Sequence, residues 1–393
     1  MKILYINSVI GYGSTGRIVY DQYKYAETKG DNPYVIYGRK EGLNDILSQN
    51  IGTKLSFISH YIKSRVFDRH GFGSKSTTKK LIDFIETYSP DVIHLHNIHG
   101  YYINVKILFD YIKINNIKTV WSLHDCWSFT GHCSHFEQIG CYKWQTHCYK
   151  CEETVGYPKR LFLDRSRKNF DEKKALFTGV NDMTLITPSD WLNKRVKQSF
   201  LNGYNVITIN NGIDLSTFKP IKSDIKEKLH ISNKKIVLGI ASPFTHKKGF
   251  DDFITLSKIL PDDYVIILVG LSKKQVNSLP SNIIGYMRLN DKVDIIKLYS
   301  AATVFINPTK EDTFPTTLIE SLACGTPVIS YDVGGCSEII EQSSGILVKK
   351  DSINDIKSAI IEITKKVNIE KACTKKAQSF DKKNCARETY NRY

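Results

Sequence analysis

The chain has 393 residues, of which 41% are apolar and 24% charged, and its formal net charge is +15. This length fits two domains with sizeable cores, and the composition excludes a disordered or fibrous chain. The positive excess indicates an anionic partner and leaves nucleic acid, acidic lipid and phosphorylated substrates open.

The opening stretch, "MKILYINSVIGYGSTG", starts with a short strand-like run and lacks the apolar core and cleavage site of a signal peptide. No run approaches the roughly 18 apolar residues of a membrane span. We therefore expect a cytoplasmic protein.

Short apolar runs alternate with helical segments through the first half of the chain. Strands are expected at "KILYINS" (2–8), "PYVIYG" (33–38), "DVIHLHN" (91–97), "KTVWSLHD" (118–125) and "MTLITPS" (183–189). Runs this apolar suit parallel strands that are covered on both faces. The pattern predicts a doubly wound α/β domain over residues 1–210.

A glycine-rich loop, "GYGSTGRI" (11–18), follows the first strand and opens a helix, as in the dinucleotide-binding pattern. The acid that should end the second strand is missing, because Gly38, Arg39 and Lys40 stand there, which disfavours NAD. Gly13 and Gly16 lack side chains and permit a ligand to approach the backbone closely.

Histidines end two of the predicted strands. His94 and His96 point to the same side of their strand by alternation, so we expect at least one to be structural; His99 follows them, and His124 ends the next strand.

Cysteines gather between residues 126 and 151. Cys133, Cys141, Cys148 and Cys151 include one C-x2-C pair, and His132, His135 and His147 lie among them. In a reducing compartment this pattern favours a structural zinc site; four reduced structural thiols are the alternative.

The strand–helix pattern restarts after "NNGID" (210–214). Strands are expected at "KKIVLGIAS" (234–242), "DYVIILVG" (263–270), "SNIIGY" (281–286), "ATVFINP" (302–308), "TPVISYD" (326–332) and "GILVKK" (345–350). We predict two Rossmann-like domains, 1–210 and 211–393, that face a central cleft, with the last helix free to return to the N-terminal domain.

"HKKGFDDFI" (246–254) follows the first strand of the second domain. A lysine before a glycine at a helix start is suited to grip a diphosphate, a role that fits Lys248 first and Lys247 second. The alternative is a pair of exposed surface lysines.

Two acids mark "KEDTFPTTLIESLACGTPVISYDVGG" (310–335). Asp312 stays in the loop before a helix expected from Pro315 to about Cys324, and Glu320 lies inside it. Backbone amides at the positive end of the helix dipole can bind an anion here. They belong to the segment Thr313, Phe314, Pro315 and Thr316. The alternative makes Asp312 a cap and Glu320 a solvated helix residue.

Taken together, these segments resemble the retaining glycosyltransferases of family 4, which have the two-domain GT-B fold. The resemblance covers the glycine loop, "HLHNIHG", "LHDCWSFTGHC", "NNGID", "HKKGFDDFI" and the acidic motif, in that order. Relatives of this kind build bacterial exopolysaccharide, capsule or O-antigen chains.

The resemblance assigns roles to residues. It implies that Glu320 holds the ribose of a UDP- or GDP-linked sugar and that Asp312 or its neighbour Glu311 holds the sugar hydroxyls. His124 would face the transferred sugar, and the loop of Gly13 and Gly16 would approach the donor phosphate and the acceptor. Many members carry an arginine six residues before the lysine that corresponds to Lys248, and the two cations together bind the leaving diphosphate as a clamp. Ser242 stands at the arginine position here, so His246 or Arg288 would complete the clamp.

The expected function is transfer of a sugar to a glycan, with retention at the anomeric carbon. No enzymic nucleophile and no D-x-D motif is visible, so no cofactor or catalytic metal is implied. A nucleotide-sugar epimerase is the alternative within enzymes. A basic zinc-containing nucleic-acid-binding protein is disfavoured, because the lysines are dispersed and no stacking motif is recognisable.

Two basic, apolar segments of the first domain indicate a membrane partner. "LSFISHYIKSRVF" (55–67) repeats apolar residues at helical spacing beside Lys63 and Arg65, and "KRLFLDRSRK" (159–168) is a second such run. The resemblance implies a lipid-linked acceptor, so peripheral contact with an anionic membrane is expected. The alternative is an ordinary helix whose apolar face packs on the sheet.

Overall fold

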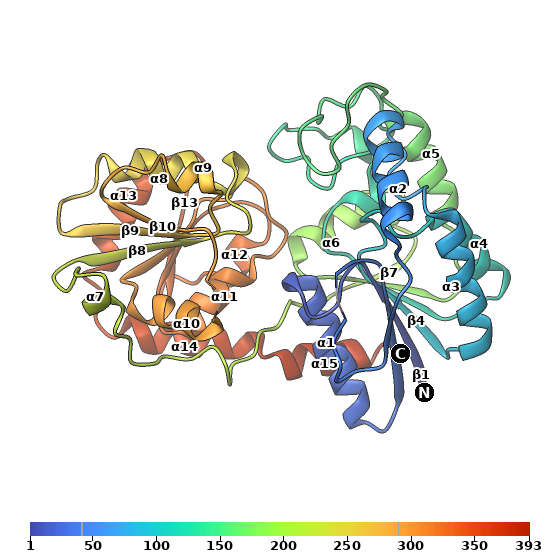
Figure 1. The fold of residues 1–393 in the computed structure, drawn as a ribbon, viewed down its shortest axis with the longest axis horizontal. Helices are drawn as coiled ribbons and strands as arrows, with labels where there is room; N and C mark the ends of the chain where they lie inside the picture. The colour runs from blue at the N-terminus through green and yellow to red at the C-terminus, as the bar shows by residue number, and fades with distance from the viewer. Residues whose placement is uncertain (41, 290) are drawn as a thin grey trace. The chain divides into compact units, whose positions relative to one another are not determined.

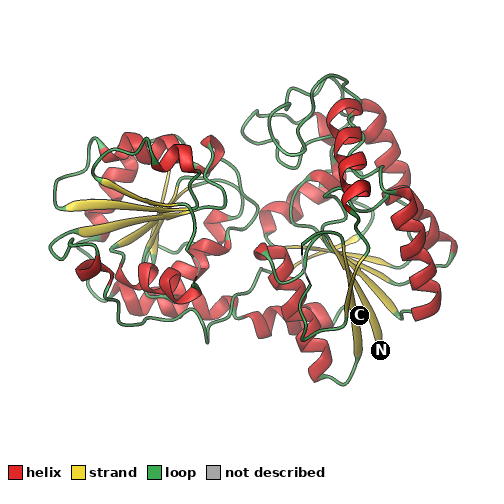
Figure 2. Cartoon of the chain, in the orientation of Figure 1, coloured by secondary structure: helices red, strands yellow, loops and turns green. Residues whose placement is uncertain are grey.

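The computed structural model describes residues 1–40, 42–289 and 291–393 and divides the chain into two compact units. The first unit comprises Met1–Asn211 and Lys383–Tyr393, and the second comprises Gly212–Lys382. The expected boundary was residue 210; the chain leaves the first unit after residue 211 and re-enters it at residue 383. Figures 1 and 2 show each unit as a sheet with helices on both faces.

The first unit contains a seven-stranded parallel sheet in the order β3-β2-β1-β4-β5-β6-β7. Its strands are β1 (Lys2–Asn7), β2 (Asn32–Tyr37), β3 (Ser48–Asn50), β4 (Val92–Leu95), β5 (Thr119–Ser122), β6 (Met183–Thr187) and β7 (Asn205–Thr208). Its α-helices are α1 (Gly13–Thr28), α2 (Lys54–Phe67), α3 (Lys75–Tyr88), α4 (Val105–Ile114), α5 (Ser166–Phe177), α6 (Asp190–Lys197) and α15 (Lys382–Tyr390), and its short 3-10 helices are Trp127–Phe129 and Lys143–Gln145.

The second unit contains a six-stranded parallel sheet in the order β10-β9-β8-β11-β12-β13. Its strands are β8 (Lys235–Ile240), β9 (Tyr264–Val269), β10 (Ile283–Tyr286), β11 (Val304–Asn307), β12 (Val328–Tyr331) and β13 (Gly345–Val348). Its helices are α7 (Ile225–Lys228), α8 (Phe250–Ser257), α9 (Lys273–Val276), α10 (Lys292–Ala301), α11 (Thr316–Ala323), α12 (Cys336–Ile339), α13 (Ile353–Ile363) and α14 (Ile369–Ala377), with 3-10 turns at His246–Lys248 and Gln378–Phe380.

Side-chain alternation builds a core on each face of the first sheet. Leu4 and Ile6 join the larger apolar cluster, whereas Ile3 and Tyr5, on the opposite face of the same strand, join the cluster beneath α1. Both faces are therefore buried, as the apolar strand runs predicted, and the expected Rossmann-like α/β architecture is confirmed in both units.

Strand order reverses between β1 and β4 in the first sheet and between β8 and β11 in the second. In open α/β sheets, ligands bind beyond the carboxyl ends of the strands at such a point. Both points carry the predicted site residues. No helix among the described residues is long and apolar enough to cross a membrane.

Candidate active site

Lys248 and Asp312 contact each other directly in the second unit. Lys248 Nζ lies 2.7 Å from Asp312 Oδ2, and the same spacing joins Lys247 Nζ to Glu311 Oε1. The lysines belong to the turn after β8, and the acids belong to the loop after β11. The two neighbouring strand ends thus bring together residues 64 positions apart in sequence.

Two glycines allow these loops to meet. Gly249 has a φ of +75°, and a Cβ there would lie 2.4 Å from Pro308, so the lysine turn packs closely on the end of β11. Gly334 has a φ of +57°, and a Cβ there would lie 1.6 Å from the carbonyl oxygen of Asp312. Any side chain at residue 334 would therefore displace the acidic loop.

The charge of Lys248 is fixed by its partner. Burial lowers the pKa of Lys248, but the Asp312 carboxylate more than offsets this, and the net effect raises the pKa above its ordinary value. Lys248 is therefore an ammonium at neutral pH, as a phosphate-binding residue must be.

Glu320 is buried inside α11, with 8% of its surface exposed, and its Oε2 accepts a hydrogen bond from the hydroxyl of Tyr299 at 3.1 Å. The alternative of a solvated helix residue is wrong for this position. A buried carboxylate with further acceptor capacity is suited to hold hydroxyls.

The first turn of α11 offers its dipole to an anion. Pro315 precedes Thr316 as the N-cap residue, and within the described chain no side chain caps the helix and no acid occupies its first turn. Phe314 is 3% exposed and its ring packs 5.7 Å from that of Phe380, while its N–H donates to Asp312 Oδ1 at 3.3 Å. Thr313 is also buried.

The residues expected to complete the clamp lie at the surface. His246 Nδ1 lies 2.7 Å from Asp251 Oδ2, and both side chains are more than 60% exposed. Arg288 is exposed after β10, and Ser242 is exposed after β8. Their predicted contribution to diphosphate binding stays a prediction.

In the first unit, the glycine loop folds back on itself between β1 and α1. The N–H of Gly11 donates to the carbonyl of Gly16 at 3.0 Å, and a Cβ on Gly16 would lie 3.1 Å from the nitrogen of Gly11. Gly13, with a φ of +66°, begins α1, and Tyr12 precedes it without a side-chain cap. The space beside Gly16 is thus filled by the loop itself, whereas Gly13 has nothing within 4 Å of its Cβ position, and the approach of a ligand to this backbone stays a prediction.

The strand-end histidines form one chain of contacts. His94 Nδ1 lies 2.6 Å from the Tyr393 hydroxyl and its Nε2 lies 2.8 Å from Ser122 Oγ, which makes His94 a buried structural residue. His96 Nδ1 lies 3.1 Å from His124 Nε2. Burial lowers the pKa of His94 to about 3 and that of His124 to about 4, so both rings are neutral at pH 7.

His124 lines a small, solvent-open hollow at the ends of β4 and β5. The described residues around it are His96, Asn97, Ile98, His99, Trp121, Leu123, His124, Asp125, Trp127 and Ser128. Asp125 Oδ2 lies 3.0 Å from His99 Nε2. Burial raises the pKa of Asp125, but the contact with His99 outweighs burial, and the net pKa is about 2. Sequence reasoning missed Asp125, although its position directly after His124 at a strand end was the available signal.

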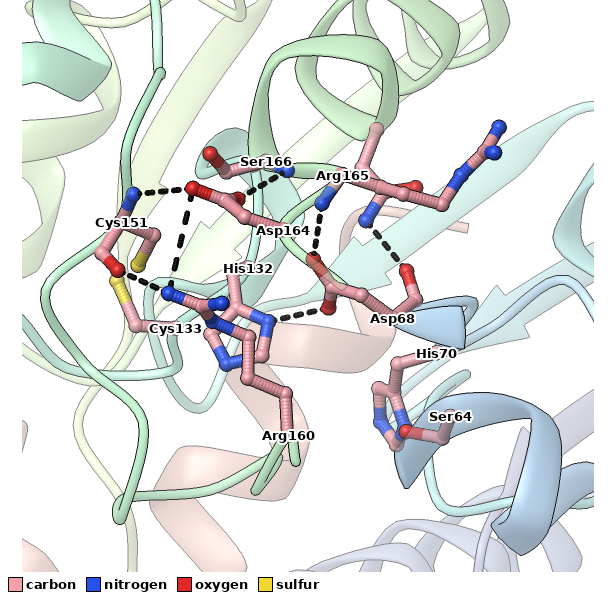
Figure 3. A network of polar contacts seen from close by, with 12 residues as sticks. Ser64, Asp68, His70, His132, Cys133, Cys151, Arg160, Asp164, Arg165 and Ser166 are labelled. Carbon is pink, nitrogen blue, oxygen red and sulfur yellow. Dashed lines mark hydrogen bonds and ion pairs between the residues drawn. The ribbon is translucent and has the colours of Figure 1, made fainter. Parts of the chain in front are cut away.

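The cysteine segment is held by polar contacts with the end of α2 (Figure 3). Asp68 ends this helix with a φ of +50°, and its Oδ1 lies 2.5 Å from His132 Nδ1. The N–H of Arg165 donates to the other Asp68 oxygen at 2.9 Å, and the N–H of Cys151 donates to Asp164 at 2.8 Å.

The four predicted zinc ligands are all free cysteines. Cys133 and Cys151 face each other in Figure 3, and the N–H of Gly131 donates to the sulfur of Cys148 at 3.2 Å. In the part of the chain that the structure describes, no group of three or more His, Cys, Asp or Glu residues forms a metal-binding cluster. The zinc site therefore stays a prediction.

Comparison with known proteins identifies the second unit most specifically. Residues 221–380 match the family model described as "Glycosyl transferases group 1". The chain is 25% identical over 368 residues to the Putative colanic acid biosynthesis glycosyl transferase WcaC of Escherichia coli K12, a match that covers 90% of this chain and 88% of that relative.

Two further similarities extend the comparison. The chain is 30% identical over 186 residues, 43% of its length, to the N,N'-diacetylbacillosaminyl-diphospho-undecaprenol alpha-1,3-N-acetylgalactosaminyltransferase of Campylobacter jejuni, and it spans about half (49%) of that relative. The solved structure of Anabaena Alr3699/HepE in complex with UDP-glucose superposes with a TM-score of 0.68, covering 100% of this chain and 98% of that one, at 16% identity. The last similarity concerns the fold.

Proposed function

We propose that the chain is a glycosyltransferase that transfers a sugar from a nucleotide donor to a lipid-linked glycan in bacterial surface polysaccharide synthesis, with retention at the anomeric carbon. The match of residues 221–380 to the glycosyl transferases group 1 model and the GT-B fold of the chain support this proposal. The observation that carries this is the direct contact of Lys248 with Asp312 after the carboxyl ends of β8 and β11, together with the buried carboxylate of Glu320 on α11, the helix that follows the acidic loop.

The donor is a UDP- or GDP-linked sugar in this proposal. Glu320 accepts hydrogen bonds from the ribose hydroxyls, and Lys248 binds the diphosphate. Asp312 lies within reach of the same ammonium, so it positions Lys248 and accepts from the sugar hydroxyls with its remaining lone pairs.

The transfer needs no enzymic nucleophile, metal or organic cofactor. The bond between the anomeric carbon and the donor phosphate oxygen breaks, and the acceptor oxygen bonds to the same face of the carbon. The acceptor's hydroxyl proton passes to the departing phosphate oxygen. Lys248 and the first amides of α11 stabilise the negative charge that grows on the diphosphate.

His124 contributes from the first unit as a neutral ring. Its pKa of about 4 prevents it from supplying positive charge at pH 7, so it acts as a hydrogen-bonding partner of a sugar hydroxyl. His96, 3.1 Å away, orients the ring.

A membrane-bound acceptor is supported by the exposure pattern of α2. Its apolar Leu55, Ile58 and Ile62 are 81%, 52% and 49% exposed, whereas its polar His60 and Ser64 are buried. The alternative, a helix with its apolar face on the sheet, does not match these exposures. The second basic run joins the same surface, since the N–H of Leu161 donates to the carbonyl of Arg65 at 2.8 Å.

Exposed apolar side chains flanked by cations suit the interface of an anionic bilayer. The Campylobacter relative is named for a diphospho-undecaprenol-linked sugar. We take the same class, a sugar linked through diphosphate to a polyprenol, as the acceptor of this chain.

A thermal-shift panel of UDP- and GDP-linked sugars tests the donor, because a ligand at a hundredfold excess over its Kd stabilises the fold by about 2.7 kcal/mol. The stabilising donor is then incubated with a polyprenyl diphosphate-linked sugar, and NMR of the product gives the anomeric configuration. Inversion would contradict the mechanism. Conversion of the donor to another sugar nucleotide without acceptor would favour the epimerase instead.

A further inference from the structure

Among the described residues of the first unit, Arg39 has no acidic partner. It follows Gly38 at the carboxyl end of β2 and is half-buried. Among the described residues its guanidinium forms no hydrogen bond or ion pair, and its Nε is fully buried without a partner. A buried polar group that stays unsatisfied costs stability, so a hydrogen-bond acceptor bound beside Arg39 would stabilise this arrangement.

The surroundings of Arg39 are built closely around it. Gly100 has a φ of +113°, and a Cβ there would lie 3.2 Å from Nη2 of Arg39, so the backbone after β4 packs next to the guanidinium. The same Cβ would lie 3.2 Å from Ser8, which follows β1. Arg39 therefore stands where the ends of three adjacent strands, β2, β1 and β4, meet.

On its other side Arg39 meets α2. Its guanidinium carbon lies 6.0 Å from the centre of the Phe57 ring, and Phe57 is one turn from Tyr61 on the same helix. The exposed apolar residues Leu55 and Ile58 flank Phe57 in sequence. The arginine thus lies between the strand ends and the helix that carries the exposed apolar face.

A second cation follows at once. Lys40 is exposed, and its ammonium lies 4.7 Å from the centre of the Tyr12 ring in the glycine loop. Within the described residues Lys40 also has no acidic partner. The end of β2 therefore presents two adjacent positive charges toward the glycine loop and α2, which favours an anionic ligand.

We propose that Arg39 binds the phosphate groups of the acceptor, with Lys40 as a second cation. This rests on the lipid-linked acceptor proposed above. In a lipid phosphate, the anion joins the apolar chain to the sugar, so a binding residue must lie between an apolar surface and the polar site. Arg39 has that position, and its planar donor fork matches phosphate oxygens in a bidentate manner.

Titration calorimetry of the full chain with farnesyl diphosphate, and with farnesol as the uncharged comparison, tests the proposal. Excess UDP is present throughout, so that the Lys248 site is occupied. We expect wild type to bind farnesyl diphosphate at least tenfold more tightly than farnesol. Arg39→Gln should raise the Kd for farnesyl diphosphate at least tenfold. Arg39→Lys, which keeps the charge without the fork, should lie between them.

Arg387→Gln is the matched control. Arg387 is exposed on α15 in the same unit, and its replacement by Gln removes the same charge as Arg39→Gln. It should bind farnesyl diphosphate within twofold of wild type, and all variants should bind UDP unchanged, which reports an intact fold. The proposal is overturned if Arg39→Gln stays within twofold of wild type or if wild type does not prefer the diphosphate over farnesol. Failure of sugar transfer alone, with Arg39-dependent binding intact, would instead refute the proposed function.

Discussion

The hydroxyl of Tyr299, on α10, donates a 3.1 Å hydrogen bond to Oε2 of Glu320, on α11, and so orients the carboxylate assigned to the donor ribose. Because Tyr299 is itself fully buried, the acid is held by the core of the second unit rather than by a surface loop. A preoriented carboxylate binds hydroxyls at little further entropic cost.

Glu320→Gln keeps the size of the side chain and removes its charge. We expect nucleotide affinity to weaken by about 1.5–3 kcal/mol, because charge-assisted hydrogen bonds become neutral ones. Calorimetry with the donor identified by the thermal-shift panel measures this. Tyr299→Phe, which leaves the charge but not its orientation, should cause a smaller loss; unchanged affinity in Glu320→Gln would refute the ribose assignment.

Lys248→Ala is expected to lower kcat at least tenfold with a smaller effect on KM, since negative charge on the diphosphate grows toward the transition state. Steady-state kinetics with the identified donor gives both constants. Lys258→Ala is the matched control, because Lys258 is an exposed lysine at the end of α8 in the same unit. A kcat within twofold of wild type would show that Lys248 is not the clamp.

Most of the fold was predictable, because both faces of each sheet are covered and the strands are continuous apolar runs. The two strands that sequence reasoning missed, β3 and β7, stand at the edges of the first sheet, and β3 consists of three polar residues, Ser48–Asn50. At the sheet edge β3 buries little surface and carries no apolar residue, so it leaves no apolar signal. β7 contains Val206 and Ile207, but it is only four residues long and its other two residues are polar.

The contacts of the site were less predictable than its residues. Lys248 and Asp312 were assigned separately to diphosphate and sugar, and their direct ion pair depends on β8 and β11 being neighbours in the sheet. The orientation of α2 was also hidden. His60 faces inward because its Nε2 accepts from the N–H groups of Gly71 and Gly73, a network formed by a later loop.

Lowering the pH should destabilise the first unit before the pH reaches the range in which Asp and Glu side chains become protonated. Burial holds the pKa of His60 and of His94 at about 3, against an ordinary value of 6.5. Between pH 6.5 and pH 3 the unfolded chain binds protons that the native chain does not. The contribution of these histidines to the free energy of unfolding is therefore fully present above pH 6.5 and is lost as the pH decreases toward 3. The slope is up to about 1.4 kcal/mol per pH unit for each group.

Urea unfolding at several pH values measures this slope, and tryptophan fluorescence reports the first unit because all 4 tryptophans lie in it. His94→Gln should reduce the slope between pH 6 and 4, although it also costs stability at pH 7 by weakening the contacts with Ser122 and Tyr393. An unchanged midpoint in wild type from pH 7 to pH 5 would contradict the prediction.

Cys148→Ser tests the zinc site. If Cys133, Cys141, Cys148 and Cys151 bind zinc, the variant should lose one equivalent of metal and part of its stability, with little direct effect on catalysis in the folded fraction. Elemental analysis of protein purified without chelator decides this, and Cys126→Ser, within the same segment, is the control. Less than a tenth of an equivalent in wild type would leave four reduced structural thiols.

The last prediction concerns the exposed face of α2. Liposomes that contain anionic lipid should carry the protein upward in a flotation gradient at low salt and release much of it at high salt, because part of the attraction is between exposed charges. Lys63→Glu with Arg65→Glu should weaken flotation by reversing two charges. Ile58→Ser with Ile62→Ser should weaken it at every salt concentration by removing apolar surface from the lipid interface.

Ile114→Ser is the control for the apolar pair. Ile114 is 82% exposed at the end of α4, in the same unit, beside the single lysine Lys113 of that helix turn and on a different helix from the α2 face, so its replacement should leave flotation unchanged. If instead Ile114→Ser weakens flotation as much as the α2 pair does, the attraction is a general property of exposed apolar residues. If wild type does not float at low salt, α2 does not bind membranes, and its exposed face must serve a different partner or a soluble acceptor.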